Sequence, residues 1–269
     1  MNFHSDEWIM DRVREHYNEA LEYFPEDRIV GIFYQGSGNY GLDYEGSDVD
    51  TKLIVTPTFE DIAMNKKAVS TTHIRENEEH IDFKDIRLYI QTFRKQNLNF
   101  LEILFTKYAI INPIYKAEWD RLVKDREQIA HYAPVQAIKS MKGIAKEKYH
   151  AMEHHYPARM AWIEKFSYDP KQLHHLLRVN EYISRYIDGE SYEACLQSKM
   201  PDYLQKVKLG FHNLDDARMI ANWAIGCIDK MCDKYLDTCS TEVDKDVDAL
   251  LDDVQHNIMK IAIKKEIGD

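Results

Sequence analysis

The sequence has no long apolar run and no segment with the composition of a secretion signal. No stretch of its 269 residues approaches the roughly 20 consecutive apolar residues that a membrane-spanning helix requires. Residues 1–7 contain neither the basic region nor the apolar core of a signal peptide. We therefore expect a cytoplasmic protein that does not enter a membrane.

Cysteine is also scarce, and its spacing is unsuited to a metal site. Cys195, Cys227, Cys232 and Cys239 form no Cys-x-x-Cys unit, and they lie in sequence of helical character. This pattern predicts reduced, packed thiols rather than disulfides or bound zinc. It agrees with a cytoplasmic location.

Basic residues are fewer than acidic ones. Lys and Arg number 35 against 46 Asp and Glu, which gives a formal net charge of −11. The chain is therefore not an indiscriminate nucleic-acid binder, because affinity for phosphate backbones comes from Lys and Arg. A helix predicted over 135–150 nonetheless carries Lys139, Lys142 and Lys146 at spacings of three and four. This face is either the best available track for an RNA backbone or an ordinary solvated face.

The most informative segment present is a glycine-rich turn after an apolar run. Residues 29–34 are β-branched or aromatic apart from one glycine, and Gly36-Ser37-Gly38 follows shortly after them. This is the pattern of a buried strand that stops at a tight turn. Gly36 and Gly38 allow the backbone to approach a ligand closely, and Ser37 adds a hydroxyl donor. The turn is therefore predicted to cradle a phosphate.

Two alternating carboxylates follow the turn. A second strand is predicted over about 49–56, and in a strand Asp48 and Asp50 project to the same face while Val49 turns to the core. Two carboxylates on one face repel each other unless a cation lies between them. Ligands that are all oxygen atoms favour Mg²⁺ or Mn²⁺.

The remaining pattern predicts an α+β fold, with a small mixed-sheet module at 1–112 and an all-helical module at 113–269. Pro113 marks the boundary because proline breaks a helix and the later sequence lacks strand alternation. A polar stretch over 59–79 is expected to be helix and loop. The other expected elements of the first module are a helix at 7–24 and strands at 28–35, 49–56 and 80–84. The helices expected in the second module span 116–130, 134–153, 156–166, 170–187, 191–208, 213–237 and 241–265.

Three segments together resemble a known family. Gly36-Ser37 followed by Ser47-Asp48-Val49-Asp50 resembles the active-site signature of the DNA polymerase beta superfamily of nucleotidyltransferases. Residues 84–91 leading to 99–105 resemble the helix pair that follows the third strand in the RNA-repair-pathway branch of that superfamily. Residues 168–178 resemble the helical-domain motif of the same branch. The resemblance covers most of residues 28–236, and it implies a nucleotidyltransferase catalytic domain at 1–112 and a helical domain at 113–269.

The resemblance also implies a third carboxylate on a neighbouring strand, as a ligand of the metal that activates the attacking hydroxyl. Asp82 lies inside the predicted strand at 80–84 and is favoured for this role. Asp85 is the alternative, although it immediately precedes an apolar-periodic run and reads best as the N-cap of a helix.

The helical module contains a predicted basic stripe. Lys171, His175 and Arg178 are spaced i, i+4 and i+7 on the helix expected at 170–187, so their side chains share a face. In the resembling family the Lys and the His of this helix face the nucleotide cleft, which implies that Lys171 and His175, together with Arg178, bind the triphosphate. A solvated surface face is the alternative. His174 lies off this face and is expected to pack.

The function that follows is transfer of a nucleoside monophosphate from a nucleoside triphosphate to an acceptor hydroxyl, with release of pyrophosphate. Asp48, Asp50 and Asp82 would be the catalytic metal ligands for Mg²⁺ or Mn²⁺, and Gly36 and Ser37 would grip the outer phosphates. The resemblance favours an RNA end as the acceptor. A protein side chain or a small molecule as acceptor, and a non-catalytic nucleotide-binding regulator, are the alternatives.

Overall fold

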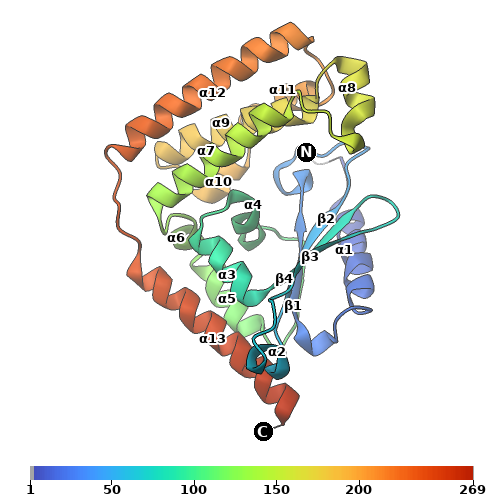
Figure 1. Cartoon of the computed structure of the whole chain (residues 1–269), viewed down its shortest axis with the longest axis vertical. Helices are drawn as coiled ribbons and strands as arrows, with labels where there is room; N and C mark the ends of the chain where they lie inside the picture. The colour runs from blue at the N-terminus through green and yellow to red at the C-terminus, as the bar shows by residue number, and fades with distance from the viewer. Residues whose placement is uncertain (1–2, 269) are drawn as a thin grey trace. The chain divides into compact units, whose positions relative to one another are not determined.

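The computed structural model (Figure 1) describes residues 3–268, with residue 158 described by its backbone alone. The chain has an α+β fold, as predicted, and separates into two compact units. One unit comprises the residues up to 133 together with those from 243 onward, and the other comprises residues 134–242.

A five-stranded mixed sheet forms the centre of the first unit. Its strands are β1 (Ile29–Gln35), β2 (Asp50–Val55), β3 (Ser70–Ile74), β4 (His80–Asp85) and β5 (Ala109–Ile111), and their order is β3-β4-β2-β1-β5. β1 pairs antiparallel with β2 and β5, β4 pairs antiparallel with β3, and β2 and β4 are parallel. The three predicted strands are confirmed at β1, β2 and β4.

β3 lies in the polar stretch that was expected to be only helix and loop. Its residues are almost all exposed at the edge of the sheet, so they lack the apolar alternation that marks a half-buried strand. The short helix α2 (Phe59–Ala63) accounts for the helical part of that stretch.

Helix α1 (Asp6–Ala20) covers one face of the sheet (Figure 1). Ile9, Val13 and Ala20 of α1 belong to one buried cluster with strand residues such as Leu53 and Val55. The helix ends at Ala20, four residues earlier than predicted, and the chain continues as a turn that lets Phe24 pack edge-on against Phe83, with ring centroids 5.2 Å apart.

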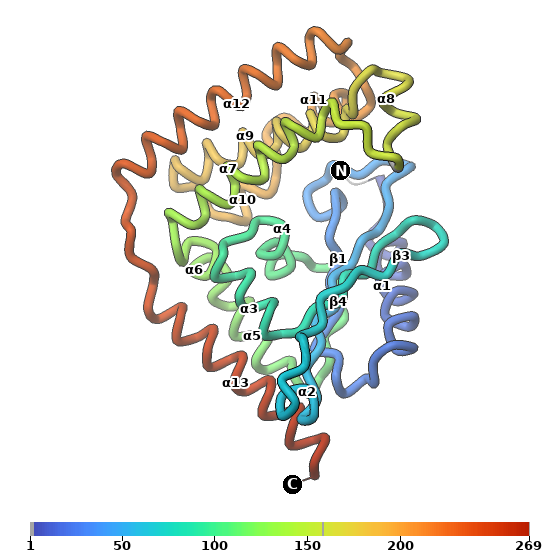
Figure 2. Tube along the Cα trace, in the orientation of Figure 1, coloured from blue at the N-terminus to red at the C-terminus, as the bar shows by residue number. Residues whose placement is uncertain are grey.

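The other face carries residues that pack against later helices of the same unit. These helices are α3 (Ile86–Arg94), α4 (Leu98–Leu101), α5 (Lys116–Lys124), α6 (Arg126–Ala130) and α13 (Lys245–Ile267), with the 3₁₀ turn η3 (Glu102–Leu104) after α4. The buried Trp119 of α5 lies against Phe33 of β1, with ring centroids 4.4 Å apart. α13 runs alongside α5 and α3 (Figure 2).

The predicted boundary at residues 112–113 therefore lies inside the first unit. Pro113 does end the strand segment, but α5 returns to the sheet because it must bury Trp119. The C-terminal helix α13 also belongs to this unit, where Arg121 of α5 pairs with Asp253 at 2.6 Å. The units divide at 133–134 and 242–243 instead.

The second unit is all-helical, as the pattern predicted. It contains α7 (Pro134–Ala151), α8 (Met160–Phe166), α9 (Pro170–Ile187), α10 (Tyr192–Leu196), α11 (Pro201–Lys208) and α12 (Leu214–Leu236), with the 3₁₀ turn η4 (Pro157–Arg159) before α8. α9 coincides with its prediction at both ends. The single helix expected at 191–208 is two helices, because Pro201 begins a new one. Within residues 3–268, no helix combines the length and apolar content needed to cross a membrane.

Candidate active site

The glycine turn and the two alternating aspartates meet at one end of the sheet. In the antiparallel pair of β1 and β2, Gln35 stands opposite Asp50, so the turn at Gly36 begins one step beyond the pair that contains the second aspartate. Ser37 opens the 3₁₀ turn η2 (Ser37–Tyr40), and its Oγ lies 3.5 Å from Oγ of Ser47, the residue before Asp48. Segments that are ten residues apart in sequence are thus held side by side.

The burial pattern sets Asp48 and Asp50 apart from the residue between them. Val49 is buried, whereas Asp48 is exposed and the side chain of Asp50 is 39% exposed. Asp50 Oδ1 also accepts the backbone N–H of His80 at 2.9 Å. This alternation of burial is the expected one, but β2 begins only at Asp50, so Asp48 precedes the strand and the same-face arrangement of the two carboxylates stays a prediction.

Asp82 lies on the strand beside this pair. Because β2 and β4 are parallel with Lys52 opposite Asp82, Asp50 and Asp82 project from the same face of the sheet. Asp82 Oδ2 lies 2.9 Å from Lys52 Nζ, and Asp82 Oδ1 accepts the Thr72 hydroxyl at 2.5 Å. Burial raises the pKa of Asp82, but the Lys52 charge and the Thr72 hydrogen bond outweigh it and hold this pKa below its usual range.

Lys52 is a site residue that the sequence reasoning missed. Its side chain is only 3% exposed, and its ammonium lies 4.3 Å from the centroid of the Phe100 ring, a cation–π contact. Lys84 approaches the same ring at 5.0 Å. The signal was present in the sequence, because Lys52 stands two residues after Asp50 and a strand places such residues on one face.

Asp85 caps a helix, as predicted. Its carboxylate accepts the backbone N–H of Arg87 at 2.8 Å and also pairs with the Arg87 guanidinium at 2.9 and 2.7 Å. Asp85 is buried and stands three residues after Asp82, so strand alternation directs the two carboxylates to opposite faces. Of the two candidates, Asp82 is the one on the face of Asp50.

The carboxylate of Glu102 accepts hydrogen bonds from the glycine turn. Its buried carboxylate accepts the N–H of Gly36 at 3.3 Å and Nδ2 of Asn39 at 3.2 Å, and the Tyr40 hydroxyl donates to it at 3.5 Å. The Gly36 N–H, which belongs to the turn predicted to cradle a phosphate, therefore has a protein acceptor here. Gly36 has a packing reason as well, because an added Cβ would lie 2.6 Å from the Tyr34 hydroxyl.

A second carboxylate that the sequence reasoning missed lies on the α1 side of the sheet. Glu79 Oε1 accepts the backbone N–H of Val49 at 3.2 Å, and its Oε2 lies 2.9 Å from His16 Nε2. The other ring nitrogen of His16 lies 2.9 Å from Oγ1 of Thr51. No local pattern signals these contacts, because His16 and Glu79 are 63 residues apart in sequence.

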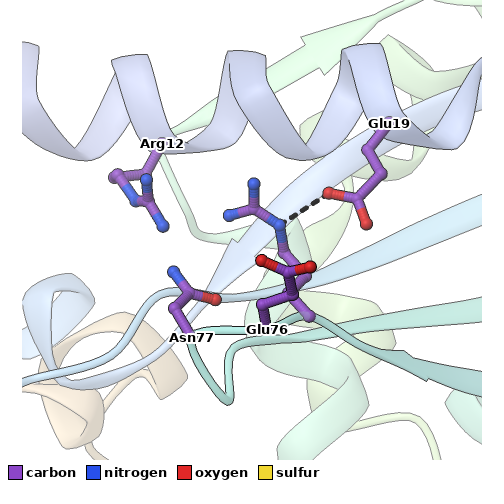
Figure 3. A pocket seen from close by; sticks show the side chains of 5 residues that line it. Arg12, Glu19, Glu76 and Asn77 are labelled. Carbon is purple, nitrogen blue, oxygen red and sulfur yellow. Dashed lines mark hydrogen bonds and ion pairs between the residues drawn. The ribbon is translucent and has the colours of Figure 1, made fainter.

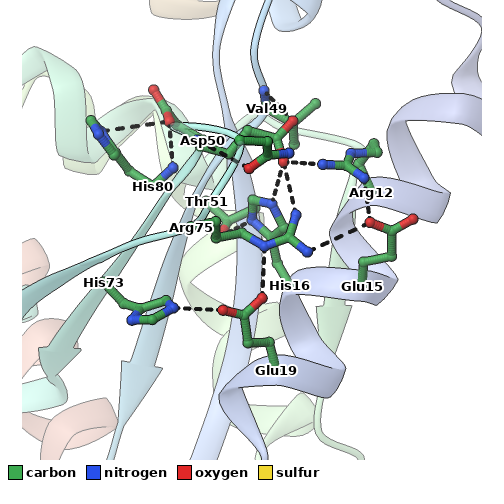
Figure 4. Close-up of polar contacts among 12 residues, drawn as sticks. Arg12, Glu15, His16, Glu19, Val49, Asp50, Thr51, His73, Arg75 and His80 are labelled. Atoms are coloured by element: carbon green, nitrogen blue, oxygen red, sulfur yellow. Dashed lines mark hydrogen bonds and ion pairs between the residues drawn. The ribbon is translucent and has the colours of Figure 1, made fainter. Parts of the chain in front are cut away.

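Two arginines complete the surroundings of Glu79. Arg12 pairs with it, and Arg75 Nη1 lies 2.9 Å from its Oε2. Figure 4 shows the side chains of Arg12, His16 and Arg75 close to one another. Burial opposes the charged form of Glu79, but the hydrogen bonds from His16 and Arg12 outweigh it and hold the pKa of this carboxyl well below its usual range.

A polar cavity of about 390 Å³ lies next to this cluster and away from the aspartates. Figure 3 shows its lining, which consists of Arg12, Glu19, Arg75, Glu76 and Asn77. Arg75 and Glu19 pair with each other across it at 2.7 Å. None of the carboxylates predicted to hold a metal lines this cavity.

The predicted triphosphate contacts lie together on α9 of the second unit. Burial, followed by neighbouring positive charge that includes Lys171 and Arg178, lowers the pKa of His175. His174 packs, as predicted: it is buried, its Nδ1 lies 2.9 Å from the carbonyl oxygen of Leu204, and its pKa falls to about 3. The helix is capped by Asp169, which also pairs with Arg159.

The lysine face of α7 is neutralised within the second unit. Lys142 Nζ lies 3.0 Å from Asp229 and 2.7 Å from Asp233 of α12, and Lys146 lies 3.7 Å from Asp229. Two of the three lysines considered as an RNA track therefore already have carboxylate partners. The spacing of Lys142 and Lys146 lets both side chains of α7 form ion pairs with α12.

No protein-family model and no curated protein matches the sequence. Among solved structures, the chain is similar to a nucleotidyltransferase-like protein from Exiguobacterium sibiricum, with 12% identity over 85% of this chain and 78% of that chain, and a TM-score of 0.30. A likeness with so low a TM-score carries no argument about function.

Proposed function

We propose that this protein is a metal-dependent nucleotidyltransferase, which moves a nucleoside monophosphate from a nucleoside triphosphate to an acceptor hydroxyl and releases pyrophosphate. One observation carries the proposal. The partly exposed carboxylates of Asp48 and Asp50 stand at the end of the sheet where the Gly36-Ser37 turn begins, and Asp82 projects from the same face on the adjoining parallel strand.

The donor type fits Mg²⁺ or Mn²⁺, and the three carboxylates must move closer to share an ion, because no three His, Cys, Asp or Glu side chains among residues 3–268 are grouped closely enough to hold one. All the candidate ligands are carboxylate oxygens, and Asp48 and Asp50 are open to solvent. A bound divalent cation would offset the charge of the phosphates and lower the pKa of the acceptor hydroxyl. Asp82 is the third ligand in this proposal, and the Lys52 ammonium must then share or leave the Asp82 oxygen that it contacts.

The other residues would act mainly by positioning and charge neutralisation. The Ser37 hydroxyl and the backbone at Gly36 would orient the outer phosphates beside the aspartate pair, and the Gly36 N–H must then leave the Glu102 carboxylate that it contacts. The resemblance also supports Lys171, His175 and Arg178 of α9 as triphosphate-binding residues, with Lys171 and Arg178 as the charged groups, because the lowered pKa of His175 leaves its ring neutral. Transfer of this kind needs few groups that react themselves.

We propose an RNA end as the acceptor, on the resemblance of residues 84–105 and 168–178 to the RNA-repair-pathway branch. The acidic chain and the paired lysines of α7 leave little charge for a broad nucleic-acid surface. The contacts to RNA are therefore expected to be few and concentrated near the reacting end. A protein or small-molecule acceptor would use the same aspartates.

A labelling experiment tests the proposal. The protein is incubated with Mg²⁺ and each α-labelled nucleoside triphosphate, with total RNA, lysate protein or no macromolecule as the acceptor. Labelled RNA is the expected product, and it should disappear in the Asp50→Asn variant but persist in Asp11→Asn, which changes an exposed carboxylate of α1. Labelled protein would reassign the acceptor. Nucleotide binding without any labelled product would indicate the regulator alternative and contradict the transferase proposal.

A further inference from the structure

A carboxylate, an imidazole and a hydroxyl form one hydrogen-bonded chain behind the aspartate pair. The chain starts where the Val49 N–H donates to Glu79 at 3.2 Å and continues from Glu79 to His16 at 2.9 Å. It ends where His16 meets the Thr51 hydroxyl at 2.9 Å. Val49 and Thr51 are the two neighbours of Asp50, so this chain contacts the residue on each side of the second aspartate (Figure 4).

Asp50 is also held from its own side of the sheet. The backbone N–H of His80 donates to Asp50 Oδ1 at 2.9 Å, and His80 Nδ1 lies 3.7 Å from the same oxygen. Because Glu79 and His80 are consecutive, one short segment hydrogen-bonds to both Val49 and Asp50. Each of the three residues from Val49 to Thr51 therefore has a hydrogen-bond partner outside β2.

The burial of this chain is costly and indicates a specific role. His16 is fully buried, Thr51 is 1% exposed and Glu79 is 5% exposed. Removing such groups from water costs free energy that apolar side chains of similar size would not cost. Arg12 and Arg75 complete the hydrogen bonding of Glu79. A satisfied buried network of this kind rigidifies its surroundings and selects one geometry.

We propose that Glu79, His16 and Thr51 are positioning residues that set the separation and direction of the Asp48 and Asp50 carboxylates. The inference rests on the proposed function, in which both carboxylates must reach one divalent cation. Hard cations tolerate little error in the placement of oxygen ligands, and partners behind the ligands commonly provide that placement. The network therefore supports the metal site without contacting the cation or the substrate.

Mn²⁺ affinity, measured by electron paramagnetic resonance without acceptor, tests the inference apart from turnover. Thr51→Val removes only the hydroxyl that His16 contacts and keeps a similar shape, whereas Thr51→Ser keeps the hydroxyl. We expect Thr51→Val to weaken Mn²⁺ binding by about 10-fold or more, the usual effect of losing a partner behind a metal ligand. Thr51→Ser should restore affinity close to that of the wild type.

Glu79→Gln provides a second variant, and Glu19→Gln is its matched control. Glu19 pairs with Arg75 and His73 in the same polar cluster but contacts none of residues 49–51. Glu79→Gln should weaken Mn²⁺ binding, and Glu19→Gln should not. Circular dichroism establishes that each variant is folded at the assay temperature, and if one of the two test variants does not fold the other decides.

The two proposals fail in different ways. Wild-type protein that binds no Mn²⁺ would overturn the proposed function and this inference with it. Wild-type binding that Thr51→Val and Glu79→Gln leave unchanged would overturn the positioning role alone. Equal loss in Thr51→Val and Thr51→Ser would also contradict it, because the hydroxyl would then not be the group that matters.

Discussion

The Lys52 ammonium lies 2.9 Å from the Asp82 carboxylate, across the parallel strands β2 and β4. A lysine that is 3% exposed thus neutralises the carboxylate proposed as the third metal ligand. The same face carries Asp50, two residues before Lys52, whose side chain is 39% exposed. Two carboxylates, of Asp50 and Asp82, and the Lys52 ammonium therefore lie on one face of the sheet.

Loss of either member of the aspartate pair should abolish transfer without unfolding the protein. Asp48→Asn or Asp50→Asn removes one carboxylate from the proposed metal site, so the rate should fall by orders of magnitude. Like-charge repulsion is relieved in the metal-free protein, so the melting temperature should hold or rise. Rate assays and thermal melts check both results, and full transfer by both variants would remove the metal assignment.

Lys52→Met should destabilise the protein and change the titration of Asp82. The variant leaves a partly buried carboxylate without its counter-charge and removes the contact with Phe100, so we expect a loss of about 1–3 kcal/mol in the free energy of unfolding. The pKa of Asp82 should rise, because burial then acts without the Lys52 charge. Carboxyl titration by NMR measures the shift. Lys84→Met, which leaves the Lys52–Asp82 pair intact, is the comparison: Lys84 lowers the pKa of Asp82 less than Lys52 does, so the rise should be smaller.

Asp82→Asn and Asp85→Asn should have opposite effects. Asp82→Asn should remove turnover and leave triphosphate binding largely in place, because Asp48 and Asp50 remain. Asp85→Asn keeps a capping side chain but loses the ion pair with Arg87, so it should lower stability by about 1 kcal/mol and leave turnover near the wild-type level. Rates and melting curves on the same preparations distinguish the roles, and the reverse pattern would exchange them.

The stabilisation that Glu79 provides should depend on pH. Its folded pKa lies below the ordinary value, so the stabilisation is complete above the unfolded pKa of about 4.3 and is lost as the pH falls toward the folded pKa. Glu79→Gln should cost about 3 kcal/mol at pH 7, because buried donors lose a charged partner. The difference from wild type should shrink below about pH 4, as measured by denaturant unfolding.

The exposed neighbour Glu15 supplies the control for this titration. Glu15 also pairs with Arg12, but its side chain is 49% exposed. Glu15→Gln should change stability by less than about 1 kcal/mol, because exposed ion pairs contribute little. A Glu79→Gln difference that stays constant from pH 7 to pH 3 would contradict the assigned ionisation of Glu79.

The lysines of α7 should matter for stability rather than for RNA. Lys142→Glu places a third carboxylate beside Asp229 and Asp233, so it should destabilise the protein. Lys139→Glu, on the same helix, should have a smaller effect on the melting temperature. RNA labelling should survive both changes when measured below the melting temperature. Selective loss of labelling in both variants, with nucleotide binding unchanged, would restore the face as an RNA track.

The sequence by itself determined the elements whose signals are local. The apolar run before Gly36 predicted β1, the periodicity after Pro170 predicted α9 at both ends, and the position of Asp85 predicted a helix cap. These succeed because strand alternation, helix periodicity and capping depend on residues within a few positions of one another. The exposure of Asp48 and Asp50 around a buried Val49 is local in the same sense.

Only the tertiary structure decided which charges meet. Val49 and Glu79 are 30 residues apart, and Lys142 and Asp233 are 91 apart, so no spacing in the sequence pairs them. The exposed strand β3 joined the sheet through backbone hydrogen bonds, which leave no apolar pattern. Likewise, α5 belongs to the first unit because Trp119 is buried there, and α13 belongs to it because its apolar residues, such as Leu251 and Ile258, are buried where it packs against α5 and α3. Pairing and burial across the chain depend on where the backbone brings distant residues, and local periodicity carries no information about that.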